Sequence, residues 1–151
     1  MTIRHIVSCR GWSSDAYWAA RATVELGRAG HDVVLVGKRS AADRIMRRAQ
    51  DAGVERFETL HLSSGVAPIK DALDLSRIVG WLPRTQILHV HRGKEHWLAA
   101  IANRLSYARR PVVRTRHIVQ PVRPHALNRW LYRSARSEEH TSELQSPIHI
   151  S

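Results

Sequence analysis

Short apolar runs alternate with stretches of helical spacing along most of the chain, and this alternation constrains the fold more than any other feature of the sequence. The run 87–91 is too short and too rich in β-branched residues to form a helix of its own, and 57–62 alternates between apolar and polar residues, so these runs predict strands. No hairpin signal joins neighbouring runs, and strands separated by helices form parallel sheets. The sequence therefore predicts an α/β fold, a doubly wound, Rossmann-like parallel sheet with helices on both faces. Strands are expected at 3–7, 32–36, 57–62, 87–91 and 111–113.

The helices between these strands are expected to bury one apolar stripe each. Ser13, Ser14 or Asp15 is available to cap the start of the first helix. The helix over residues 40–52 has a basic, solvated face. The stripes are Trp18, Ala22 and Leu26 in the first helix, Leu75, Ile78 and Leu82 in the third, and Trp97, Leu98, Ile101 and Leu105 in the fourth.

Imidazole and guanidinium side chains gather where the last two strands end. His89 and His91 are two residues apart on one strand, so both point to the same face, and Arg114 and Arg116 share a face in the same way. Ligands of parallel sheets bind at the carboxyl ends of the strands, so these side chains are expected to line one cleft. Imidazole exchanges protons near neutral pH, and guanidinium binds phosphate or carboxylate. The alternative for either histidine is packing at a strand end.

A small-residue loop containing Gly11 follows the first strand and precedes the first helix. Backbone N–H groups at a helix start attract anions, so this loop is a candidate phosphate site. Gly11 has no second glycine at the spacing of a GxGxxG motif, which argues against a nicotinamide-type site. The alternative is a tight turn that needs glycine.

The chain is strongly basic, with a formal net charge of +11, and no acidic residue lies between His96 and Ser137. Such a surface suits the phosphate groups of nucleic acid, nucleotide or anionic lipid and does not choose among them. Cys9 is the only cysteine, so no internal disulfide can form, which fits a reducing cytoplasm. The sequence shows neither the apolar core of a signal peptide nor a run of transmembrane length. A cytoplasmic location is therefore expected.

The tail from Arg136 departs from the alternation of strands and helices and offers little to a core. Residues 136–151 resemble the translation of a sequencing-adapter oligonucleotide, read through in a truncated gene. The tail is therefore expected to be non-native and disordered. The domain is expected to cover residues 1–135 and to stop short of its last strands.

Four segments of the sequence together resemble a known family. They are the opening strand with Arg10-Gly11-Trp12, the segment 28–33 (RAGHDV), the strand 87–91 (ILHVH) and the strand 111–117 (PVVRTRH). In these segments residues 1–135 resemble the amino-terminal domain of family-4 retaining glycosyltransferases with the two-domain GT-B architecture. The last two segments, in this order and at this separation, are the most specific part of the likeness.

The resemblance implies transfer of a sugar from a nucleotide-sugar donor to a glycan or lipid-linked acceptor, with retention of the anomeric configuration. It implies no cofactor and usually no bound metal. It implies that Gly11 and Trp12 approach the donor phosphates, and that His91 or His89 contacts the transferred sugar and serves catalysis. The acceptor side implied by the resemblance consists of Arg92, Lys94, Glu95, Arg114, Arg116 and His117. For Lys94 and Glu95, a helix-capping pair is the alternative.

The nucleotide-binding carboxy-terminal domain of such enzymes has no counterpart in this sequence. Without its charges to stabilise the leaving diphosphate, the fragment alone is expected to be inactive. The acid-free stretch also favours docking on anionic headgroups at the inner face of the membrane. The alternative function is a basic nucleic-acid- or phosphate-binding module. No nucleic acid is expected as a partner, because the aromatic residues lie mostly in helical stripes and no helix-turn-helix or zinc pattern occurs.

Overall fold

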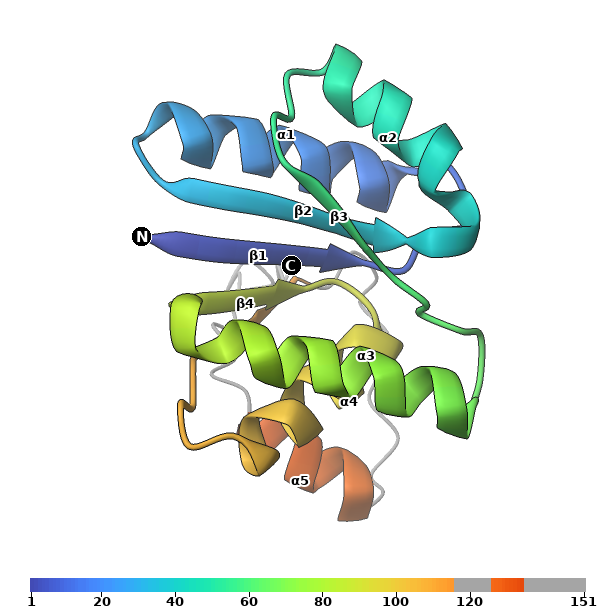
Figure 1. Ribbon diagram of the computed structural model, residues 1–151, viewed down its shortest axis with the longest axis vertical. Coiled ribbons are helices and arrows are strands. Elements are labelled where there is room, and N and C mark those ends of the chain that lie inside the picture. The colour runs from blue at the N-terminus through green and yellow to red at the C-terminus, as the bar shows by residue number, and fades with distance from the viewer. Residues whose placement is uncertain (116–125, 135–151) are drawn as a thin grey trace, which may run out of the picture.

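The computed structural model describes residues 1–115 and 126–134, which form a sheet flanked by helices (Figure 1). The strands are β1 (Thr2–Val7), β2 (Asp32–Lys38), β3 (Phe57–Leu60), β4 (Ile87–Val90) and β5 (Val112–Arg114). The helices are α1 (Ser14–Arg28), α2 (Ala42–Asp51), α3 (Pro68–Trp81), α4 (Gly93–Leu105) and α5 (Ala126–Ser134), with 3-10 turns at Arg39–Ala41 and Leu82–Arg84. The predicted alternation of strands and helices is confirmed.

The sheet has five strands in the order β3-β2-β1-β4-β5, and every pair of neighbours is parallel. The chain builds outward from β1 to β2 and β3, then returns to the other side of β1 for β4 and β5. The predicted Rossmann-like parallel α/β fold is confirmed. In such a sheet, ligands bind outside the carboxyl ends of the strands at the point where the order reverses, which here lies between β1 and β4.

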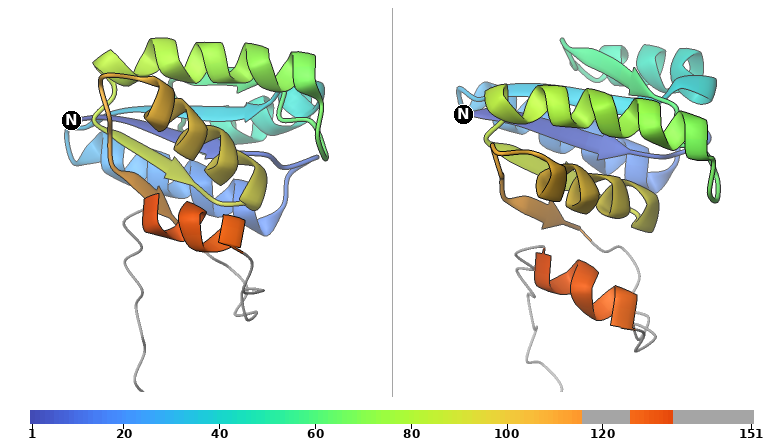
Figure 2. Two further views of the ribbon diagram at one scale, coloured as in Figure 1. Left: turned by 90° about the horizontal axis from the view of Figure 1, so that it is seen from below. Right: turned by 60° about the horizontal axis from the view of Figure 1, so that its bottom comes forward.

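Each face of the sheet carries its own hydrophobic core, because successive side chains of a strand point to opposite faces. Figure 2 shows α1 and α3 on opposite sides of the strands. Ile6, Val36, Leu88 and Val90 pack under α3 and α4 in one core. Val7 and Leu35 pack in the other core, which α1 and α2 cover.

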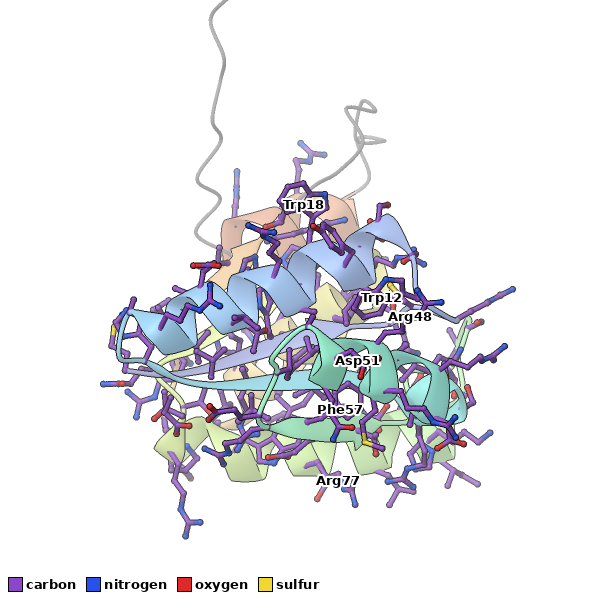
Figure 3. The ribbon with its side chains drawn as sticks, turned by 90° about the horizontal axis from the view of Figure 1, so that it is seen from above. Trp12, Trp18, Arg48, Asp51, Phe57 and Arg77 are labelled. Carbon is purple, nitrogen blue, oxygen red and sulfur yellow. The ribbon has the colours of Figure 1, made fainter. Side chains whose placement is uncertain are left out.

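The predicted apolar stripe of α1 is wrong for Trp18, whereas Ala22 and Leu26 are half-buried. The helix buries small side chains instead, and Trp18 is 55% exposed, on the side of α1 away from α2 (Figure 3). His5 of β1 lies beneath this face of α1, where its Nδ1 is 3.3 Å from the hydroxyl of Thr23. The buried residues of α1 are Ala16, Ala19, Ala20 and Thr23.

The helices of the opposite face follow the predicted pattern more closely. Ile78 of α3 and Leu82 of the 3-10 turn that follows it are fully buried, and Leu75 is partly buried, as predicted. Helix α4 buries Leu98 as predicted, but Leu105 at its last position is 64% exposed. The inner face of α4 also holds two polar residues, Glu95 and His96.

Candidate functional site at the carboxyl edge of the sheet

Two segments meet at the carboxyl ends of the central strands β1 and β4. Glu95, in the first turn of α4, accepts a hydrogen bond from the backbone N–H of Ser8, with 2.6 Å between Oε1 and N. Arg92, just before α4, donates to the carboxylate of Asp15 in the first turn of α1, with 2.8 Å between Nε and Oδ2. These two contacts hold the loop after β1 beside the start of α4, at the reversal point of the sheet.

Glu95 is fully buried, although its side chain was predicted to bind acceptor hydroxyls. Its Oε2 atom has no hydrogen-bond partner among the described residues. Burial raises the pKa of the Glu95 carboxyl, against the opposing effects of its hydrogen bonds and of Arg92. In the structure this side chain braces the loop after β1. Its acceptor role remains a prediction.

Replacing Glu95 with glutamine is expected to raise the free energy of unfolding at neutral pH. Glutamine keeps an oxygen that can accept from Ser8 and removes a charge whose burial is costly. Because the folded-state pKa of Glu95 is raised, its contribution to stability is present below its unfolded pKa and is lost as pH rises through the folded pKa. Urea unfolding of both proteins from pH 4 to pH 8 should show the gain only in the upper part of this range. A constant difference across the range would contradict the expectation.

Gly11, predicted to approach donor phosphates, lies in a bend of the loop after β1. Gly11 does not have a positive φ, the backbone conformation that favours glycine. A Cβ built on Gly11 meets no described atom within 4 Å. Neither backbone conformation nor packing therefore requires glycine here, and the open space above it suits a close approach by a ligand. Its neighbour Trp12 packs against the core under α1 and α2, beside the first turn of α1 (Figure 3).

Two cations that were not among the predicted site residues converge on Ser64. Arg10 follows β1 and Lys38 ends β2, and their side chains lie 3.3 Å and 3.4 Å from Oγ of Ser64, in the loop after β3. Neither cation forms an ion pair with a carboxylate in the part of the chain that the structure describes. Their charge is thus available for an anion at this edge. The three residues are far apart in the sequence, so only the strand order could have grouped them.

Lys94 lies at the same edge, where its side chain contacts both the loop after β3 and helix α3. Its Nζ atom is 2.7 Å from the Asp71 carboxylate and 2.8 Å from the backbone oxygen of Gly65. It therefore ties the start of α4 to the start of α3. This contact holds the ammonium group, and the predicted acceptor role of Lys94 remains a prediction.

His91 follows β4 and is 6% exposed, and its ring lies next to that of His89, with centroids 5.0 Å apart. Nε2 of His89 lies 2.7 Å from Oγ1 of Thr115. A third ring, that of His5 in β1, stacks on His89 with centroids 4.0 Å apart. His5 was not a predicted site residue. The register that pairs it with His89 across two strands is not visible in the sequence.

Arg114 does not face the same side as the two histidines, so the expectation of one shared cleft is wrong for this residue. Arg114 is in register with Val90, whose side chain lies in the core under α4. Its Nη1 lies 3.1 Å from Nδ1 of His96 in α4. Guanidinium is a donor only, so Nδ1 of His96 accepts and carries no proton. Burial, and then the charge of Arg114, lower the pKa of His96 to about 4.

Arg116 and His117, predicted to line the acceptor side, lie outside the described residues. So does the predicted non-native tail, residues 136–151, together with the expected domain end at residue 135. The roles and structure expected for these segments stay predictions.

No protein-family model matches the chain, and no curated protein sequence matches it. Among solved structures, it is similar to the crystal structure of MurG from Acinetobacter baumannii, with a TM-score of 0.66 at 13% sequence identity. The match covers 89% of this chain. MurG is a GT-B glycosyltransferase. The chain has the fold of a GT-B domain. It spans 39% of the length of the MurG chain, so the likeness concerns one part of such a protein.

Proposed function

We propose that this chain is the acceptor-side domain of a GT-B glycosyltransferase. The enzyme transfers a sugar from a nucleotide-sugar donor to a glycan or lipid-linked acceptor, as in family 4, with retention of the anomeric configuration. The observation that carries the proposal is the match to MurG over 89% of this chain. The polar carboxyl edge between β1 and β4 supports it, since this is where ligands of such sheets bind.

In this proposal the loop after β1 approaches the donor phosphates. The open space above Gly11 admits the ligand, and Arg10 and Lys38 supply positive charge from two strand ends. Preorganised cations that meet a leaving diphosphate stabilise the charge that develops in the transition state. Trp12 holds the shape of the loop through its packing on the core.

His91 is the residue proposed to contact the transferred sugar. It comes directly after β4 at the reversal point of the sheet, one position beyond the last strand residue. Arg92, Lys94, Glu95, Arg116 and His117 are proposed for the acceptor side. A partner domain would supply the nucleotide site, so the chain by itself is expected to be inactive.

The proposal is tested with the whole protein that contains this chain. A panel of nucleotide sugars and of glycan and lipid-linked acceptors is incubated with it, and release of the nucleotide is measured with and without acceptor. Acceptor-dependent release from one donor is expected, and NMR of the product should show the anomeric configuration of the donor sugar. Transfer with inversion would refute retention, and no transfer across the panel would refute the function. The isolated chain serves as the inactive control.

The location proposed for this enzyme is the cytoplasm, at the inner face of the membrane. None of the helices in the described parts of the chain has the length and hydrophobicity needed to cross a bilayer. A pocket of about 350 Å³ between α4 and α5 is bordered by three exposed arginines and by Trp130, which stacks on Trp97. The arginines are Arg104, Arg109 and Arg133. Their grouping beside tryptophan suits anionic headgroups.

Replacing all three arginines of this pocket with alanine is expected to weaken binding to anionic vesicles. Each cation near such a surface contributes on the order of 1 kcal/mol, so the loss should be roughly 100-fold. Co-sedimentation with phosphatidylglycerol vesicles measures it, with phosphatidylcholine vesicles and added salt for comparison. The matched control replaces three exposed arginines of α2, namely Arg44, Arg47 and Arg48. Equal binding to neutral vesicles, or an equal loss in the control, would contradict the proposal.

A further inference from the structure

Three imidazole rings form a cluster under α1, at the centre of the sheet. This histidine cluster consists of His5, His89 and His91. His5 and His89 are in register on β1 and β4, and His91 lies two residues further toward the carboxyl edge. The ring centroid of His5 is 4.0 Å from that of His89 and 4.9 Å from that of His91. One ring nitrogen from each histidine lies within 4.8 Å of the other two.

The hydrogen bonds of His5 define which of its ring nitrogens carries the proton. Thr23 of α1 has one hydroxyl proton, which it donates to the backbone oxygen of Ala19 at 2.8 Å. The contact of 3.3 Å between Thr23 Oγ1 and His5 Nδ1 therefore requires Nδ1–H to donate. In a neutral ring this leaves a lone pair on Nε2.

Nε2 of His5 is buried and has no hydrogen-bond partner among the described residues. A buried polar atom of this kind costs free energy unless a water or an ion satisfies it. A neutral imidazole with an unshared lone pair is the form that ligates a metal ion.

We propose that the histidine cluster binds one transition-metal ion of the zinc class through its three imidazoles. Imidazole ligands suit zinc, copper and nickel rather than magnesium or calcium. Tetrahedral zinc with bonds of about 2.0–2.1 Å needs ligand nitrogens about 3.3 Å apart. The present separations of up to 4.8 Å therefore close by ring rotation when the ion binds. This inference goes beyond the glycosyltransferase function and does not depend on it.

The surroundings of the histidine cluster fit this assignment. Metal-binding histidines are usually oriented by a hydrogen bond at the opposite ring nitrogen. Thr23 provides such a contact for His5, and Thr115 provides one for His89. The residues that α1 buries above the sheet are small, namely Ala16, Ala19, Ala20 and Thr23. Three protein ligands leave a fourth position for solvent.

The test uses the full chain, prepared without a histidine tag and stripped of metal. Zinc titrated by calorimetry is expected to bind one to one, and magnesium is expected not to bind. Cobalt(II) should give the visible absorption of tetrahedral coordination without a thiolate charge-transfer band, which separates this site from Cys9. His5→Asn and His89→Asn should each weaken zinc binding at least tenfold. The control His61→Asn, in the partly exposed loop after β3, should leave binding within twofold.

A measurement on the unmodified chain guards against variants that fail to fold. Long-range ¹H–¹⁵N NMR should show zinc shifting one ring nitrogen in each histidine of the cluster. Thr23→Val, which removes only the partner of His5, should weaken zinc binding by about tenfold. Unshifted resonances of His5, or zinc binding that His5→Asn and His89→Asn leave intact, would overturn the proposal. A site that holds only water would give the same negative result.

Discussion

Replacing His91 with alanine in the whole enzyme is expected to lower turnover by about 10-fold to 10⁴-fold, the range for losing a positioned polar group at a reaction centre. The reason is its place directly after β4, at the reversal point of the sheet where a bound sugar would lie. Nucleotide binding should change little, because that task is proposed for a partner domain. Turnover and donor affinity are measured together, in buffer with a chelator so that no metal occupies the histidine cluster.

His89→Ala is the matched control for this experiment. Its Nε2 contacts Thr115 and its ring stacks on buried His5. Loss of the ring should therefore lower the melting temperature clearly and turnover per folded molecule only slightly. His91 is itself only 6% exposed, so His91→Gln, which keeps polar atoms at the site, is assayed alongside, with thermal unfolding of each variant. Wild-type turnover in folded His91→Ala would remove His91 from the proposed reaction centre.

Replacing Asp74 with alanine is expected to cost about 3–5 kcal/mol of unfolding free energy, since two charge-assisted hydrogen bonds are lost in the interior. Asp74 is fully buried in α3. Its two oxygens accept from the backbone N–H groups of His61 and Leu62, at 2.8 Å and 2.9 Å. Leu62 has a φ of 44°, a conformation that most side chains avoid, and these bonds hold it in place. The loop they anchor carries Ser64, where the cations of the carboxyl edge meet.

Chemical denaturation of the chain measures this loss. Asp74→Asn should lose about half as much, because an amide keeps one acceptor but faces the second N–H with a donor. Asp51→Ala, at an exposed position at the end of α2, should change stability by less than about 0.5 kcal/mol. A loss under about 1 kcal/mol for Asp74→Ala would mean that water replaces the carboxylate and that the loop is held by other contacts.

The elements of this fold were predictable because they depend on local spacing. Apolar runs of strand length separated by helical stripes admit few arrangements, and parallel pairing follows from the helical connections. Ile78 and Leu82 were correctly assigned to the core for the same reason, since they pack in a core formed with apolar strand residues such as Val36, Leu60 and Leu88. Trp18 was wrongly assigned to the stripe of α1, because the buried face of this helix is made of small residues instead.

The site was predictable only in its location. Polar residues after β1 and β4 had to reach the carboxyl edge, and Gly11, His91, Arg92 and Glu95 lie at or next to it. Which atoms meet there depends on contacts between distant segments. Glu95 turned inward to Ser8, and Lys94 was bound by Asp71, through partners that no spacing rule identifies.

Local periodicity in the sequence by itself determined the strands, the helices and the parallel α/β fold. Only the tertiary structure decided which side chains share a face across neighbouring strands. Register settles that question, and a shift of one residue moves a side chain to the other face. Val113, rather than Arg114, is in register with His89, so Arg114 lies against α4 while Thr115 reaches His89. The same register brings His5 beside His89, and so creates a histidine cluster from residues 84 positions apart in the sequence.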